Sequence, residues 1–322
     1  MRLALSHKTK QILWLLLKLG VVVLAVWFIL HRLTNNNRLD FAVFADALKS
    51  QLYSRQGWVL LLAMLSVINW FFEIKKWQVL VSAEKNINFN TAARQTLIAL
   101  SASIFTPNRI GEFGVKPLFF DKNLRIHIFF LTFLHHFLQL MVTVVLGGIA
   151  AFLFISEFNF EIYADEKRTL AIASFFAIAI LGFMLWKRDK QLFGFSLAKA
   201  FGYVLKNGTV VKKAFLFSVL KYIVFAHQFY GLALLFKPGL DYYLAMVLIS
   251  VMYLLSSLLP VLSALEMVVK GSIAIWLLGF LGMPEIPVLC VVTLMWLLNV
   301  CLPALLGGYL LLKAPFPLKK AK

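Results

Sequence analysis

Hydrophobic residues lie in long runs along this chain, separated by short polar or basic stretches. The runs long enough for membrane spans are residues 12–30, 58–80, 125–155, 169–186, 214–236 and 288–312. A helix rising about 1.5 Å per residue needs about twenty apolar residues to cross a bilayer. We therefore predict an all-α fold, a polytopic transmembrane helical bundle that forms one integral membrane domain over residues 1–322. No small-residue cleavage site follows the first run, so we expect a retained span and not a cleaved signal peptide.

A shorter apolar segment, residues 94–121, carries charged residues and a helix break. Its apolar first half, residues 95–105, has eleven residues, about half of what a span needs. Pro107 ends the helix there, because it lacks an amide hydrogen and disfavours helical geometry at the residue before it. Gly111 then allows a tight turn or a close approach to a ligand. We predict a re-entrant hairpin whose break faces protein or a water-filled cavity inside the membrane.

A second interrupted segment covers residues 242–282. Its first apolar run stops at Pro260, and Glu266 and Lys270 follow before apolar sequence resumes. Two interpretations remain open: two complete crossings, giving eight spans in all, or a second re-entrant hairpin beside six spans. Short, proline-interrupted segments at corresponding places in two halves are typical of inverted-repeat transporters. In that case Pro107 and Pro260 are the corresponding breaks.

The composition excludes a soluble protein. Of 322 residues, 61% are hydrophobic and only 14% are charged, too few to cover a soluble core. The net charge of +18 does not indicate nucleic-acid binding, because no polar stretch is long enough to form a basic binding domain. It indicates contact with anionic phospholipid head groups. Apolar positions at helical spacing within the basic segment 187–213 predict an amphipathic helix on the cytoplasmic membrane surface, and residues 40–56 predict another surface helix.

The distribution of lysine and arginine predicts the orientation. Basic residues concentrate in segments that share one side with both termini, so the positive-inside rule places the N-terminus and the C-terminus in the cytoplasm. The protein is then a multi-pass protein of the cytoplasmic (inner) membrane, and the acidic segment 156–165 faces outward. We also expect the last turn of the span at residues 58–80 to emerge among Lys75 and Lys76.

The stretch TPNRIGE, residues 106–112, resembles the membrane part of the lysylphosphatidylglycerol synthase and flippase family. In that family a similar motif follows a short apolar helix, and a leucine–proline break with a later glutamate lies near the C-terminal end. Here residues 259–260 and Glu266 take those places, although the glycine-rich sequence that often precedes the glutamate is missing. The resemblance implies a protein that translocates a lipid between leaflets, serving a lipid made by another enzyme. Family members with synthetic activity carry a soluble aminoacyl-transferase domain, and because this chain shows none we expect no lipid aminoacylation.

The candidate substrate-binding residues lie at the two breaks. They are Pro107, Arg109, Gly111, Glu112, Lys116 and Glu266. Arg109 can clamp a phosphate with its planar guanidinium, while Glu112 can meet an ammonium group or couple to a proton. The alternative is a mutual ion pair between Arg109 and Glu112 that only neutralises a buried break. Lys116 either adds a second positive contact or extends to the membrane interface.

Two histidines are candidates for a proton relay. His135 and His136 are adjacent in an apolar run, so they point to different faces of a helix, and a packing role is the alternative to the relay. Glu266 and Lys270 are four residues apart and can pair with each other. No spacing of histidine, cysteine and acidic residues indicates a metal site, and no nucleophile or phosphate-loop motif is present in the sequence. We expect neither a metal nor a cofactor.

These observations favour a flippase-like protein over an enzyme. The first hypothesis is that broken helices bind an anionic phospholipid or a lipid-linked head group in a polar cavity and move it across the membrane. The second is a membrane-embedded transferase or hydrolase acting on a lipid phosphate, with Glu112 or His135 as the base. The third is a non-catalytic membrane subunit that docks a separate lipid-modifying enzyme through residues 187–213.

Overall fold

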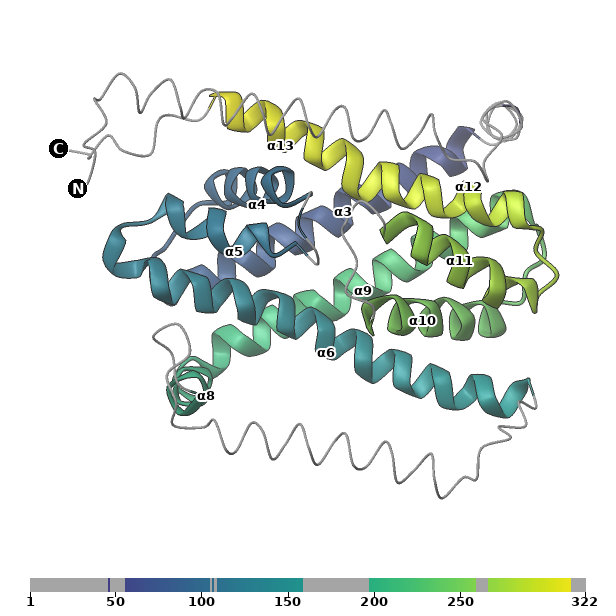
Figure 1. Ribbon diagram of the computed structural model, residues 1–322, viewed down its shortest axis with the longest axis horizontal. Coiled ribbons are helices and arrows are strands. Elements are labelled where there is room, and N and C mark those ends of the chain that lie inside the picture. The colour runs from purple at the N-terminus through teal and green to yellow at the C-terminus, as the bar shows by residue number, and fades with distance from the viewer. Residues whose placement is uncertain are drawn as a thin grey trace, which may run out of the picture.

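The structure is a computed structural model, and it describes residue 46 and residues 56–104, 106, 109–158, 197–258 and 266–313 (Figure 1). All regular elements in these ranges are helices, and no strand occurs among them. The expected spans at residues 12–30 and 169–186, most of the surface helix at residues 40–56, Pro107 and Pro260 lie outside the described residues. The all-α prediction is therefore confirmed for the part of the chain that is described.

Four described segments are long and apolar enough to cross a membrane. They are α3 (Gln56–Val81), η2 with α6 (Lys122–Leu124 and Arg125–Glu157), α9 (Gly208–Phe236), and the run of α12 (Glu285–Trp296), η3 (Leu297–Cys301) and α13 (Leu302–Lys313). Large apolar side chains such as Val67 on α3 and Phe152 on α6 are more than two-thirds exposed. A helix that faces lipid is expected to expose apolar side chains in this way. The protein is therefore a membrane protein with several spanning helices.

Shorter helices lie between these long ones. They are α4 (Phe89–Ser103), α5 (Gly111–Val115), η1 (Lys116–Phe119), α10 (Tyr242–Leu258) and α11 (Glu266–Gly279). Asn88 begins α4 because its side-chain oxygen accepts a hydrogen bond from the Thr91 amide at 2.8 Å. In Figure 1, α4 and α5 extend from one end of the molecule towards its middle, and α10 and α11 extend from the opposite end.

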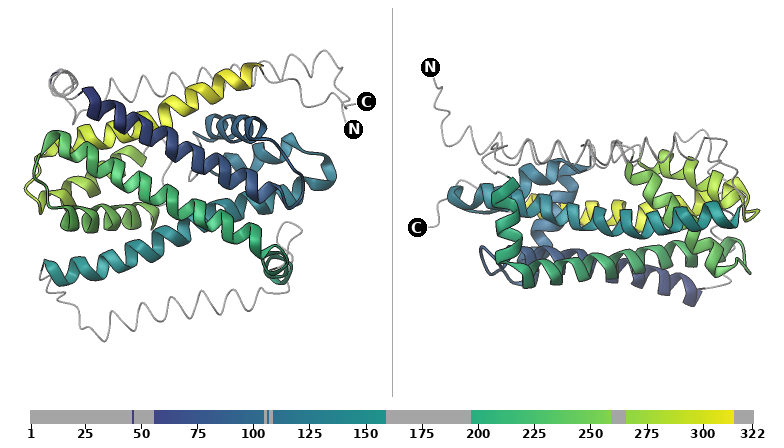
Figure 2. Two further views of the ribbon diagram at one scale, coloured as in Figure 1. Left: turned by 180° about the vertical axis from the view of Figure 1, so that it is seen from behind. Right: turned by 90° about the horizontal axis from the view of Figure 1, so that it is seen from below.

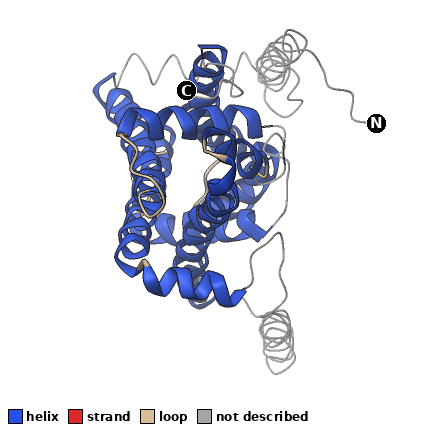
Figure 3. Ribbon diagram, turned by 90° about the vertical axis from the view of Figure 1, so that its left-hand side faces the viewer, coloured by secondary structure: helices blue, strands red, loops and turns tan. Residues whose placement is uncertain are grey.

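The long helices run in roughly the same direction, so that most helices are seen end-on along the long axis (Figure 3). At the centre, α3 and α9 lie side by side, as the left view of Figure 2 shows. The short helix α4 packs on α13, and the short helix α10 packs on α6. The helix α8 (Leu197–Lys206) lies within the expected basic surface segment and runs across the long helices (Figure 1).

Glycines bring the short helices close to the long ones. A Cβ at Gly307 on α13 would collide with the Leu97 carbonyl oxygen and the Ser101 hydroxyl of α4. A Cβ at Gly147 on α6 would lie 2.6 Å from the Leu254 Cβ of α10. Small residues allow helix backbones to approach closely in membranes, where van der Waals packing holds helices together. Close packing at a glycine therefore brings α4 against α13 and α10 against α6.

The prediction that the last turn of the span at residues 58–80 emerges among Lys75 and Lys76 is wrong for Lys76. The helix α3 continues to Val81, and Lys76 is 1% exposed instead of emerging from the protein. Its ammonium group is buried because a carboxylate, Glu73, lies one turn earlier on the same helix, 2.9 Å away. A buried lysine is tolerated only where such a partner is present.

Candidate functional site

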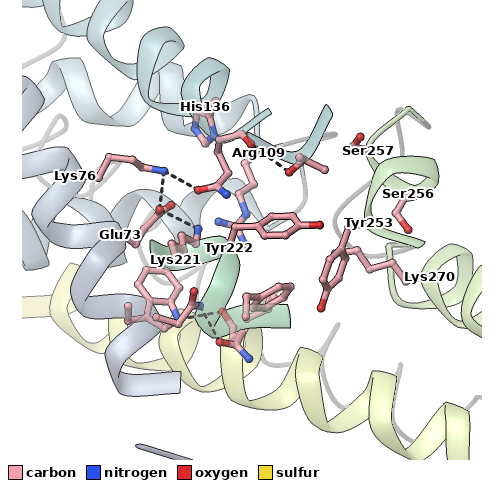
Figure 4. Close-up of a pocket in the computed structure, with 17 residues that line it drawn as sticks. Glu73, Lys76, Arg109, His136, Lys221, Tyr222, Tyr253, Ser256, Ser257 and Lys270 are labelled. Carbon is pink, nitrogen blue, oxygen red and sulfur yellow. Dashed lines mark hydrogen bonds and ion pairs between the residues drawn. The ribbon is translucent and has the colours of Figure 1, made fainter. Parts of the chain in front are cut away.

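A cavity of about 290 Å³ lies among the long helices, and Figure 4 shows the residues that line it. Four polar residues, each at or next to the middle of its candidate span, line it: Asn69, Gln139, Tyr222 and Asn299. The remaining lining residues come mainly from α3, α6, α9, α10 and α11, and include Arg109 from the break before α5. If the four helices cross a membrane, the cavity lies near its midplane, where charged groups are costly and therefore usually functional.

Glu73 is the centre of an ion-pair cluster on one wall of the cavity. Its Oε2 lies 2.9 Å from the Lys76 ammonium and 2.9 Å from the Lys221 ammonium. Its Oε1 lies 3.1 Å from Nε2 of His135, which is fully buried. Lys76 also donates to the Gln139 side-chain oxygen at 3.3 Å. Both carboxylate oxygens of Glu73 are therefore already occupied by donors from α3, α6 and α9.

Arg109 has a strained backbone and reaches the cavity. Its φ is +57°, the only positive value for a non-glycine residue in the described ranges. This left-handed conformation is rare for a residue with a long side chain, and such strain concentrates at functional sites. No hydrogen bond or short ion pair joins its guanidinium to another residue in the described ranges. The break thus holds a half-buried cation in the cavity that makes no short contact with a carboxylate, although Glu112 is near enough to attract it electrostatically.

The second carboxylate, Glu112, is not a lining residue. It is buried and lies 2.8 Å from the Lys116 ammonium and 3.4 Å from Nε2 of His136. Lys116 is fully buried as well, and its ammonium lies 4.3 Å from the centre of the Trp77 ring. The expectation that Lys116 extends to the membrane interface is therefore wrong, because the carboxylate and the aromatic ring hold its charge inside the protein.

An amide network lies below the ion-pair cluster. Asn69 donates to the Asn299 side-chain oxygen at 2.9 Å, and Asn299 donates to the Gln228 side-chain oxygen at 3.0 Å. Gln228 in turn donates to the Ser66 hydroxyl at 2.6 Å. Asn299 belongs to η3, a π-helical turn, and such turns are frequent at functional sites. The network links α3, α9 and the last span at the floor of the cavity.

The far wall of the cavity is more aromatic. Figure 4 places Glu73, Lys76 and Lys221 on one side and Tyr253, Ser256 and Lys270 on the other. The Tyr253 ring lies 5.2 Å from Phe225 and 6.1 Å from Tyr222, centre to centre. The buried Tyr253 hydroxyl finds no hydrogen-bond partner among the described residues. The cavity therefore has cations on both sides, with an ion-pair cluster on one wall and Tyr253, hydroxyl groups and Lys270 on the other.

The structure brings together only part of the predicted site. Of the predicted residues, Arg109 and His136 line the cavity, while Glu112, Lys116 and His135 lie buried behind it. Gly111 packs so closely that a Cβ would lie 2.9 Å from the Ser103 Cα, which fixes the break against the end of α4. Glu266 begins α11, but its side chain, like Pro107, lies outside the described residues.

Sequence reasoning missed Glu73, Lys76, Lys221 and Asn299 as site residues. A signal was present, because Glu73, Lys76 and Lys221 are charged residues inside long apolar runs. Within the described ranges, no group of three or more histidine, cysteine or acidic side chains is arranged to hold a metal ion.

Comparisons of the chain with family models, with curated proteins and with solved structures give no match. The functional argument therefore depends on the geometry of the cavity.

Proposed function

We propose that this protein translocates a phospholipid or a lipid-linked head group across the cytoplasmic membrane. The observation that carries the proposal is the cationic cavity at half the length of four apolar helices, with Arg109 held in it by a strained break. Arg109 is half-buried and makes no short ion pair in the described ranges, and a cation at this depth in a membrane is costly unless a nearby negative group or a ligand compensates its charge. The head group of an anionic lipid supplies that charge, while its acyl chains remain in the bilayer.

The proposed mechanism uses two re-entrant hairpins related by an inverted repeat. In this interpretation α3 to α6 correspond to α9 to α13, and the packing of α4 on α13 corresponds to that of α10 on α6. The sequence offers matching features in each half. A Glu-x-x-x-Lys pair follows each proline break, at residues 112–116 and 266–270, and a glycine pair lies in each following span, at residues 147–148 and 307–308.

Inverted repeats allow one half to rock against the other around a site at the midplane. Arg109, after the first break, and Ser257 and Lys270, on either side of the second, line the cavity, so in this interpretation the head group would meet the two hairpins from opposite sides of the membrane. The proposal agrees with the resemblance of residues 106–112 to a flippase family. It also places both termini in the cytoplasm, with six complete spans and two hairpins.

The test is lipid movement in liposomes that contain the purified protein. Acyl-labelled lipids with different head groups are placed in one leaflet, and their access to a membrane-impermeant quencher is followed over time. We expect at least one lipid to move faster than in protein-free liposomes, and Arg109→Gln to lower this rate at least tenfold. Lys85→Gln is the matched control, since it removes a cation from an exposed loop residue outside the cavity. Movement no faster than in protein-free liposomes for every head group contradicts the proposal.

A further inference from the structure

The cavity has a charge balance that restricts its ligand. Among the lining residues that the structure describes, Lys76, Arg109, Lys221 and Lys270 are positive and Glu73 is negative, so positive charges outnumber negative ones by three. Glu112, the next carboxylate, neutralises Lys116 and lies outside the cavity. A ligand that balances these lining residues therefore carries more than one negative charge.

From this balance we infer that the site is selective for a terminal phosphate, a phosphate monoester or diphosphate at the end of a lipid head group. This inference rests on the proposed function and names its substrate class. A phosphate monoester carries about −1.5 to −2 charges near neutral pH. A phosphodiester carries one negative charge, and a zwitterionic head group has a net charge of zero.

The hydrogen-bonding groups of the cavity fit the same chemistry. The Arg109 guanidinium presents five N–H donors in a planar fork that matches phosphate oxygens. The Tyr253 hydroxyl, buried and without a partner among the described residues, is a further donor on the opposite wall. Lys221 keeps donors beyond the one that it gives to Glu73, since an ammonium group has three. A terminal phosphate has enough oxygens to accept from several of these donors at once.

A cationic head group fits poorly. Glu73 already accepts from Lys76, Lys221 and His135, so the described lining carboxylate keeps only about one of its four lone-pair sites for a substrate ammonium. An ammonium in the cavity would face Arg109 and Lys221, and like charges in a low dielectric repel strongly. The volume of about 290 Å³ lies at the lower end of the range for small-molecule pockets, so it fits a head group and not a whole lipid.

A measurement of ligand binding tests this inference separately from lipid transport. The dissociation constants of short-chain phosphatidic acid (monoester), phosphatidylglycerol (diester) and phosphatidylcholine (zwitterion) are measured from thermal stabilisation of the purified protein in detergent. We expect phosphatidic acid to bind at least tenfold more tightly than phosphatidylglycerol, and phosphatidylcholine most weakly. Arg109→Gln should remove most of this preference, and Lys85→Gln should preserve it. Inorganic phosphate is the fourth probe, and if it binds as tightly as phosphatidic acid, the anion site stands but belongs to free phosphate.

The outcomes distinguish the two claims. Selective binding of phosphatidic acid with no lipid movement in liposomes supports the anion site and overturns translocation. Movement of lipids with equal binding of all three head groups overturns the phosphate inference and leaves translocation standing. A preference that survives Arg109→Gln also overturns the inference, because the preference then arises elsewhere in the protein.

Discussion

His135 and His136 are consecutive on α6, yet each lies against a different buried carboxylate. Nε2 of His135 lies 3.1 Å from Glu73, and Nε2 of His136 lies 3.4 Å from Glu112. His135 is fully buried and meets the Trp77 ring edge-on, whereas the His136 side chain is 27% exposed and lines the cavity. The predicted separation onto two helix faces is confirmed, and it assigns the two residues to two different clusters.

The two histidines should respond differently to substitution. His135→Ala removes a buried ring and a partner of Glu73, so we expect it to lower the free energy of unfolding by about 2–4 kcal/mol. His136→Ala removes a partly exposed ring with a long contact, so the expected loss is below about 1 kcal/mol. Thermal unfolding of both variants in detergent checks this. Equal losses would show that the two side chains are equally embedded in the core.

The contact between α4 and α13 depends on Gly307. A methyl group there collides with the Leu97 carbonyl oxygen, which belongs to a helix backbone and cannot move aside as a flexible side chain does. We expect Gly307→Ala to destabilise the protein by about 1–3 kcal/mol, the usual cost of overpacking, and to slow transport because α4 leads into the break. The measurements are the unfolding temperature and the rate of lipid movement.

Gly148→Ala is the matched control for this prediction. It is also a glycine in a spanning helix, but a Cβ there has nothing within 4 Å. Replacing glycine by alanine inside a helix stabilises by about 0.5–1 kcal/mol where space allows. The contrast between the two variants therefore reports close packing and not helix propensity. If both substitutions stabilise, α4 and α13 are not in close contact.

The helix break within residues 94–121 could be predicted from the local sequence. The apolar stretch before Pro107 is too short for a span, and α4 indeed ends at Ser103, with α5 beginning only at Gly111. The all-α fold followed from the long apolar runs. The start of α4 at Phe89 was not foreseen, although the Asn88 cap gives a sequence signal for it.

The contacts of the site could not be predicted in the same way. Glu73 and Lys221 are separated by 148 residues, and no local pattern selects one as the partner of the other. Arg109 and Glu112 are close in sequence and suggested a mutual pair, but Glu112 lies 2.8 Å from Lys116, one helical turn further on. Which buried charged residues pair with each other depends on how the helices pack, and this packing cannot be read from a single sequence.

Glu112 and Lys116 allow a test of structural against functional roles. Both side chains are almost fully buried and pair at 2.8 Å. Removing one partner of a buried pair typically costs about 3–5 kcal/mol, because the other charge is left uncompensated. We expect Glu112→Gln and Lys116→Met each to destabilise by about this amount, and the double variant to recover most of the loss.

The double-mutant cycle is followed by chemical or thermal unfolding in detergent, with lipid movement measured on the folded fraction. Recovery of transport together with stability in the double variant identifies the pair as structural. Loss of transport in a double variant of normal stability would instead return Glu112 to the substrate-binding role that its position in the motif suggested. Lys85→Gln should change neither quantity.

Arg109 is the residue for which stability and function should change in opposite directions. Its φ of +57° is unfavourable for arginine but easily adopted by glycine. Arg109→Gly therefore relieves backbone strain of about 1–3 kcal/mol, an amount that glycine's larger entropy in the unfolded chain partly offsets. It also removes the one cation that the break places in the cavity. We expect an unfolding temperature equal to or above that of the wild type, together with loss of lipid movement and of anion binding. Arg109→Asn, which also tolerates a positive φ, should behave in the same way. If both variants are less stable than the wild type and keep their transport, the guanidinium holds the fold together, and the strain at the break does not serve the ligand.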